Sequence, residues 1–185
     1  PEVTLDDLIV SPDTAALLDG VVHHVTLQHQ VMEAWGFRAR LPRGAGVAAL
    51  FGGPPGTGKT MAAEAIAAEL EQDLWRVDLS CVVSKYIGET EKNLAAAFDG
   101  AEAAGAVLFF DEADSLFGKR TEVKEAHDRY ANLEVNYLLQ RVETFTGLVV
   151  LATNREQAID SAFLRRLRFM VRFESPDAEA RAQLW

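Results

Sequence analysis

The chain has 185 residues, a formal net charge of -10 and 49% hydrophobic residues, a composition typical of a folded globular domain. The negative charge repels phosphate backbones, so we expect no broad nucleic-acid-binding surface. No stretch approaches the roughly 18 uninterrupted apolar residues of a membrane-spanning helix, and residues 1–10 lack the pattern of a signal peptide. We therefore expect a cytoplasmic protein without a membrane segment.

The N-terminal part predicts a linker and one helix. Ser11 is a capping hydroxyl before the first-turn proline Pro12, and the helix that they open is expected to reach about Met32. We assign residues 1–45 to this linker and helix. Three histidines in this segment lack a partner at metal-ligand spacing, so we interpret them as surface residues of the helix: His23, His24 and His29.

Short apolar runs predict the strands of the core. Three runs lack polar alternation and are separated by helix-capable stretches: residues 46–53, 105–112 and 147–154. This pattern is typical of strands buried on both faces of a parallel sheet. Shorter strands are predicted at 74–79 and 169–173. Because crossovers are right-handed, the sequence predicts an α/β fold with a doubly wound parallel sheet of about five strands flanked by helices, over residues 46–175.

Two smaller expectations concern packing. One helical face is predicted from apolar residues spaced i, i+3, i+4, i+7: Val135, Leu138, Leu139 and Val142. The single cysteine, Cys81, cannot form an internal disulfide, and we expect it to be a small buried apolar residue.

The first apolar run leads into a loop with the pattern of a phosphate-binding site. Residues 53–60 read GPPGTGKT and match G-x-x-x-x-G-K-[ST], with a predicted strand before and a helix after them. Glycines let successive N–H groups point at a phosphate, and the helix N-terminus adds partial positive charge. Lys59 would reach the β- and γ-phosphates and the Thr60 hydroxyl would hold Mg²⁺. The alternative is an ordinary glycine-rich turn.

Polar residues also follow the second and third runs. Asp111 and Glu112 end the second run, where a carboxylate can bind Mg²⁺ directly or through water and its neighbour can polarise an attacking water. Two adjacent acids favour hydrolysis over binding alone, although an acidic helix N-terminus would have the same sequence. The third run ends in Thr153 and Asn154, and the Asn154 amide could orient the same water.

A cluster of arginines follows the third strand: Arg165, Arg166, Arg168 and Arg172. It could be an ion-paired surface, because exposed ion pairs are common and weak. The more specific hypothesis is an arginine finger, which one subunit presents to the γ-phosphate bound by another.

Five motifs, in order along nearly the whole chain, together resemble the AAA family of ring ATPases: GGPPGTGKT, SKYIGETEKN, VLFFDEAD, LATN and DSAFLRRLR. The resemblance implies that Lys59 and Thr60 are the Walker A pair, Asp111 and Glu112 the Walker B pair, and Asn154 the sensor-1 residue. It implies trans-acting fingers at Arg165 and Arg168. The family usually has proline and glycine between these arginines, whereas Arg166 and Leu167 stand here, so the principal finger stays open.

The same resemblance implies ATP and Mg²⁺ as cofactors. The expected nucleotide-binding residues are Gly53, Pro54, Pro55, Gly56, Thr57, Gly58, Lys59, Thr60, Met61 and Asp111. Ile9, Val10 and Met61 lie where the family places the adenine, but all three could be core residues. Residues 176–185 would begin the family's helical lid, most of which we expect to be missing here. Residues 127–143 are also similar to bacterial AAA proteins of phage-tail-like contractile injection systems.

The resemblance implies a threading role for residues 84–93. An aromatic-apolar-glycine triplet, Tyr86, Ile87 and Gly88, would form the central pore loop that grips a protein substrate. Tyr86 could instead pack on its own domain. The leading hypothesis is a Mg²⁺-dependent ATPase that acts as a homo-oligomeric ring, by family expectation a hexamer, and unfolds, threads or disassembles a protein. The alternatives are a nucleotide-gated assembly switch that does not translocate substrate and, with less support, a P-loop kinase.

Overall fold

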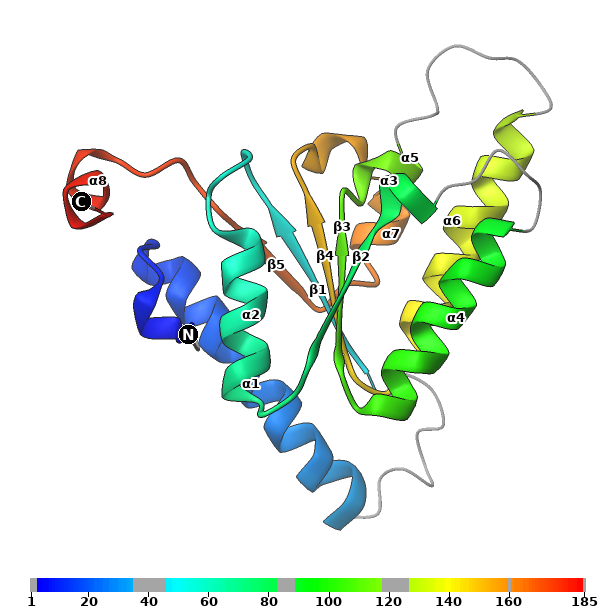
Figure 1. Cartoon of the computed structure of the whole chain (residues 1–185), viewed down its shortest axis with the longest axis horizontal. Coiled ribbons are helices and arrows are strands. Elements are labelled where there is room, and N and C mark those ends of the chain that lie inside the picture. The colour runs from blue at the N-terminus through cyan, green and yellow to red at the C-terminus, as the bar shows by residue number, and fades with distance from the viewer. Residues whose placement is uncertain (1–2, 35–45, 83–88, 118–126, 160, 185) are drawn as a thin grey trace.

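The structure is a computed structural model that describes residues 3–34, 46–82, 89–117, 127–159 and 161–184. Its centre is one five-stranded sheet with the order β2-β3-β4-β1-β5. All four neighbouring pairs of strands are parallel. Helices cover both faces of the sheet (Figure 1). The predicted doubly wound α/β fold is therefore confirmed.

The strands coincide with the five predicted apolar runs: β1 Val47–Gly52, β2 Leu74–Asp78, β3 Val107–Asp111, β4 Leu148–Thr153 and β5 Phe169–Arg172. β1 and β4 are buried at every position. β1 pairs with β4 on one side and with β5 on the other. The order of the strands thus reverses at β1, and ligands of doubly wound sheets bind beyond the carboxyl ends of the strands at such a point.

Alternate residues of the strands separate the core into two layers. Val47, Ala49 and Phe51 face α1 Pro12–Ala34 and α2 Lys59–Glu69. Ala48 and Leu50 face α4 Glu89–Ala104 and α6 His127–Thr144 on the other side. This period of two is that of a strand buried on both faces.

The predicted helix boundaries and faces largely agree with the structure. α1 begins at Pro12, and Ser11 caps it by accepting a hydrogen bond from the Thr14 N–H to Oγ at 3.2 Å. The predicted apolar face of α6 lies in the core, with Val135, Leu138, Leu139 and Val142 buried. No helix in the described ranges is both long and apolar enough to cross a membrane.

Short elements complete the fold: η1 Leu5–Asp7, α3 Leu79–Val82, α5 Asp114–Phe117, η4 Glu156–Ala158, α7 Ser161–Leu164 and α8 Ala178–Leu184. The prediction that Cys81 is buried is wrong. Cys81 lies on α3 and is exposed, and its thiol donates to Asp78 Oδ2 at 3.6 Å. A one-turn helix after an edge strand buries a single face, and Leu79 occupies that face.

Candidate active site

The loop after β1 turns sharply through three glycines with positive φ. Gly53, Gly56 and Gly58 have φ values of 146°, 76° and 95°, a region that residues with a Cβ rarely adopt. Gly58 is the N-cap of α2, which begins at Lys59. A Cβ at Gly53 would lie 2.1 Å from the carbonyl oxygen of Phe173. The loop therefore needs glycine at Gly53 for both its backbone angle and its close packing.

Lys59 is buried at the start of α2 and points back into this loop. Its Nζ donates to the carbonyl oxygens of Gly53 and Pro54, both at 2.7 Å, and to Asn154 Oδ1 at 2.9 Å. These bonds use the three donors of an ammonium group. Burial lowers the pKa of Lys59, and nearby acidic residues, first among them Asp111, partly offset this effect. The lysine is thus a desolvated cation held among neutral oxygens.

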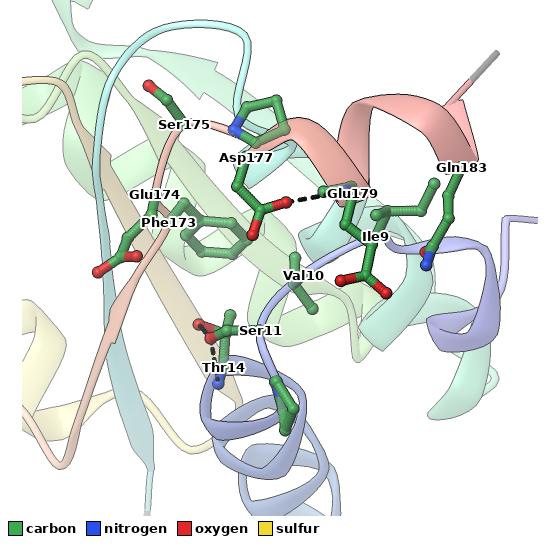
Figure 2. A pocket seen from close by; sticks show the side chains of 13 residues that line it. Ile9, Val10, Ser11, Thr14, Phe173, Glu174, Ser175, Asp177, Glu179 and Gln183 are labelled. Atoms are coloured by element: carbon green, nitrogen blue, oxygen red, sulfur yellow. Dashed lines mark hydrogen bonds between the residues drawn. The ribbon is translucent and has the colours of Figure 1, made fainter.

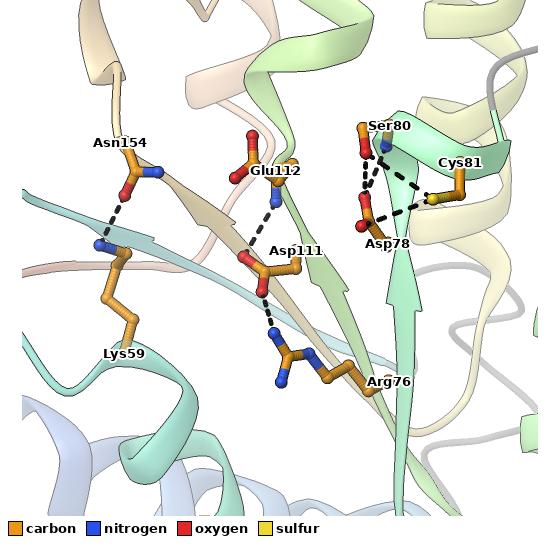
Figure 3. A network of polar contacts seen from close by, with 8 residues as sticks. All are labelled: Lys59, Arg76, Asp78, Ser80, Cys81, Asp111, Glu112 and Asn154. Atoms are coloured by element: carbon orange, nitrogen blue, oxygen red, sulfur yellow. Dashed lines mark hydrogen bonds and ion pairs between the residues drawn. The ribbon is translucent and has the colours of Figure 1, made fainter. Parts of the chain in front are cut away.

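Asn154 reaches Lys59 because β4 lies beside β1. Gly52 pairs with Thr153 in the parallel register, so both strands end at the same edge of the sheet. Figure 3 shows the Asn154 amide directed at the Lys59 ammonium. The expectation that polar groups gather at the strand ends holds here, although the two residues are 95 positions apart in the chain.

The acidic pair lies at the end of β3, next to β4. Asp111 is half-buried, and its Oδ1 accepts a hydrogen bond from the Glu112 N–H at 3.0 Å. Glu112 is exposed and has a φ of 55°, which is strained for a residue other than glycine. Its carboxylate accepts no hydrogen bond from the described residues. The strained backbone therefore presents a free carboxylate beside the loop and Asn154.

Two contacts of this site were not predicted from the sequence. Arg76 on β2 donates from its terminal nitrogen to Asp111 Oδ2 at 2.6 Å (Figure 3). Thr153 is buried, and its hydroxyl donates to Asp114 Oδ1 at 2.9 Å. The register of β2 and β3 brings Arg76 to Asp111, and the helix α5 after β3 brings Asp114 to Thr153. The sequence carried no motif for either contact.

The donor set suits a hard cation only in part. Asp111 and the half-buried Thr60 offer a carboxylate and a hydroxyl, which are oxygen ligands of the type that Mg²⁺ prefers. Within the described ranges, no three side chains of His, Cys, Asp or Glu converge as a metal site. Mg²⁺ commonly binds through one or two carboxylates together with substrate phosphates. The residues therefore fit a metal that binds together with a nucleotide.

Comparison with known proteins identifies the family. The family model described as "ATPase family associated with various cellular activities (AAA)" matches residues 49–177. The chain belongs to the AAA family. A curated relative from Sinorhizobium fredii, "Uncharacterized AAA family ATPase y4kL", is 34% identical over 96% of the chain. "Cell division protein C" of Sulfolobus acidocaldarius is 32% identical over 99% of it. The AAA chain spans about half (52%) of the length of each of these two relatives.

Other AAA proteins are similar in sequence and in structure. Spastin from Xenopus tropicalis is 39% identical over 73% of the chain, which spans 23% of that protein. The crystal structure of the FIGL-1 AAA domain matches 99% of the chain and 59% of its own length, with a TM-score of 0.71 and 30% identity. A second structure of that domain, in complex with ADP, has a TM-score of 0.70.

The residues expected at the adenine divide between two places. Ile9 and Val10 line a hollow of about 450 Å³ between the N-terminal segment and α8 (Figure 2). Phe173, Asp177 and Glu179 line it from the other side. Met61 lies on the first turn of α2 and is not among its lining residues. The loop of residues 53–60 is partly exposed, and the Thr57 hydroxyl donates within it to the Pro54 carbonyl at 2.8 Å.

The bonds of the two arginines expected as fingers go to residues other than those of this site. Arg168 precedes β5, and its backbone N–H donates to the Ala48 carbonyl at 2.9 Å, near the start of β1. The loop of Lys59 follows the other end of β1, about 13 Å further at roughly 3.3 Å per residue. The Arg168 guanidinium donates to His24 Nε2. Arg165 is exposed, and its Nε donates to the Ser161 carbonyl at 3.3 Å.

The expectation that the histidines lie on the surface of the helix does not hold for His24. His23 is exposed, whereas His24 is half-buried, with its ring 5.8 Å from that of Phe169. Burial and the charge of Arg168 lower the pKa of His24. Tyr86, Ile87 and Gly88, the expected pore loop, lie outside the described residues.

Proposed function

We propose that this AAA chain is the nucleotide-binding part of a Mg²⁺-dependent ATPase. One observation carries the proposal. The cation of Lys59, the amide of Asn154 and the carboxylates of Asp111 and Glu112 all lie at the carboxyl edge of three adjacent strands. The similarity to an ADP-bound AAA domain agrees with a nucleotide at this edge.

Each side chain has a distinct role in this proposal. The N–H groups of residues 53–60 and the Lys59 ammonium bind the phosphates, since neutral oxygens now hold that ammonium and phosphate oxygens carry the opposite charge. Glu112 accepts a proton from the attacking water, because its carboxylate is exposed and carries no hydrogen bond from the described residues. Asn154 orients that water without adding charge.

Thr60 and Asp111 are the residues that would hold Mg²⁺. The ion, when bound, neutralises charge that develops on the phosphate oxygens. Asp111 is already oriented, since its two oxygens accept hydrogen bonds from the Glu112 N–H and from Arg76. The chain therefore contributes a fixed carboxylate and a hydroxyl at the first turn of α2.

A second copy would complete the site in the whole protein. Arg168 lies near the amino edge of the sheet, remote from its own Lys59, which suits a head-to-tail ring in which each copy supplies an arginine of this segment to its neighbour. We favour Arg165 as the principal finger. Its terminal nitrogens bond none of the described residues, whereas His24 already engages the guanidinium of Arg168.

We infer that ATP hydrolysis in such a ring drives remodelling of a protein substrate, with Tyr86 and Ile87 as the gripping pair. The support is family membership together with the resemblance of the SKYIGETEKN segment. Tyr86→Ala should abolish substrate remodelling and leave ATP turnover largely unchanged. In a nucleotide-gated switch without translocation, Tyr86→Ala would instead leave both ATP turnover and the activity of the protein unchanged.

The ATPase proposal is tested by phosphate release from the protein in its assembled state. Lys59→Ala should lose nucleotide binding, whereas Glu112→Gln should bind ATP and hydrolyse it slowly. Full turnover by either variant would contradict the assigned site. Mixing Arg165→Ala subunits with Glu112→Gln subunits should restore part of the activity, because some interfaces then combine an intact finger with an intact carboxylate. A mixture as inactive as its parents argues against a finger in trans.

A further inference from the structure

Arg76 is the arginine that bonds the Asp111 carboxylate of the candidate site. It lies on the edge strand β2 and pairs in register with Phe109, two residues before Asp111. Residues two apart on a strand point to the same face, so Arg76, Phe109 and Asp111 share a face. That face is the one that α2 covers, because Phe109 packs with Ala62 and Ala63 of α2. Arg76 therefore approaches Asp111 from the face of the sheet on which Lys59 and Thr60 lie.

The ion pair occupies the carboxylate that would hold the metal. Arg76 donates to Asp111 Oδ2 at 2.6 Å, and the Glu112 N–H donates to Oδ1 at 3.0 Å. Each oxygen of Asp111 thus already has one donor. Within the described ranges, no group of three or more His, Cys, Asp or Glu side chains offers a cation site built from protein ligands alone. At Asp111, a free divalent cation would meet a carboxylate that Arg76 already neutralises, together with the positive charge of that arginine.

We propose that Arg76 is a positioning residue that makes metal binding depend on nucleotide. It fixes the orientation of Asp111, and its charge keeps free divalent cations away until phosphate oxygens supply the missing ligands. The inference rests on the proposed function, since it assigns Asp111 to the metal. The ligand concerned is a divalent cation with a preference for oxygen.

The exposure of Arg76 and Asp111 sets how strongly the arginine changes the affinity for a divalent cation. The Arg76 side chain is 56% exposed and that of Asp111 22%, so water screens their interaction with any ion. A unit charge about 6 Å from a divalent ion, in a medium close to water, changes the affinity about tenfold. Arg76→Gln should therefore bind a free divalent cation about tenfold more tightly than the unmodified protein.

The test uses Mn²⁺, an oxygen-preferring ion whose free concentration is measured by electron paramagnetic resonance. The protein is titrated with Mn²⁺ in the absence of nucleotide. Arg76→Gln should gain affinity, and adding Asp111→Asn should remove the gain. Arg76→Lys keeps the charge and should behave as the unmodified protein. Arg166→Gln is a matched control, because it removes one charge from an exposed ion pair, with Glu143 at 3.0 Å, outside the site.

The outcomes separate this inference from the proposed function. Binding of Mn²⁺ together with ATP to the unmodified protein tests the site itself, and its absence would contradict the proposed function. If that binding occurs but Arg76→Gln binds free Mn²⁺ no more tightly than the unmodified protein, the inference is wrong. An equal gain in Arg166→Gln would also overturn it, since the effect would then be one of net charge. If Arg76→Gln does not fold, Arg76→Met is titrated instead, with the same expected gain.

Discussion

The strained backbone at Glu112 predicts a conflict between stability and activity. Glu112 and Glu71 both have a φ of 55°, and both are exposed. A left-handed residue with a Cβ costs roughly 1–2 kcal/mol. Glycine removes this cost but loses roughly 0.5–1 kcal/mol through the greater freedom of the unfolded chain. Glycine at either position should therefore raise the free energy of unfolding by about 0.5–1 kcal/mol relative to alanine.

The comparison of glycine with alanine isolates the backbone, because both variants lack the carboxylate. Four variants are unfolded in urea and followed by circular dichroism: Glu112→Gly, Glu112→Ala, Glu71→Gly and Glu71→Ala. Phosphate release is measured in parallel, and only the two changes at Glu112 should reduce it. Alanine as stable as glycine at both positions would refute the strain argument. If glycine is more stable than alanine at position 71 but not at position 112, local contacts stabilise the left-handed backbone at Glu112.

Three further predictions concern other residues of the fold. Gly53→Ala should lower the free energy of unfolding in urea by roughly 3 kcal/mol, since it adds a clash with a backbone oxygen to an unfavourable φ. Gly56→Ala should lower it by roughly 1–2 kcal/mol, because open space surrounds that glycine and only the φ is unfavourable. His24 has a lowered pKa, so the unfolded chain binds the proton more readily, and the free energy of unfolding falls as the pH drops below the ordinary value of 6.5. His24→Gln should show a smaller fall between about pH 7.5 and 5. Lys59 also has a lowered pKa, so wild-type stability should rise as the pH approaches the ordinary value of 10.5, and Lys59→Met should lack that rise. Equal pH profiles of variant and wild type would contradict either titration.

Much of the site could be predicted because parallel strands deliver their carboxyl ends to one edge. Lys59, Asp111 and Asn154 each follow a continuous apolar run, and such runs are the strongest local signal of a buried strand. Once the runs are assigned to one parallel sheet, their ends must lie together. The Lys59–Asn154 hydrogen bond is the direct result.

The rest depends on register and packing, for which the sequence has no local signal. Arg76 and Asp111 are 35 positions apart, and His24 and Arg168 are 144 apart. Neither pair can be selected from the other charged residues of the chain without the order and register of the strands. Cys81 shows the same limit, because its exposure follows from the shortness of the helix after an edge strand.

Lys59 and Arg76, the two basic residues of the site, have acceptors of different charge, so we expect them to respond differently when phosphates bind. Lys59 bonds to neutral carbonyl and amide oxygens, so phosphate oxygens, which add an opposite charge, can replace all three acceptors at little cost. Arg76 bonds to a carboxylate, which a phosphate displaces less readily. We therefore expect Lys59 to move towards the nucleotide and to release Asn154, while Arg76 keeps Asp111 in place. Site-specific infrared or NMR labels on Asn154 and Asp111 would separate the two cases, since only the Asn154 amide should change its hydrogen bonding to Lys59 on nucleotide binding.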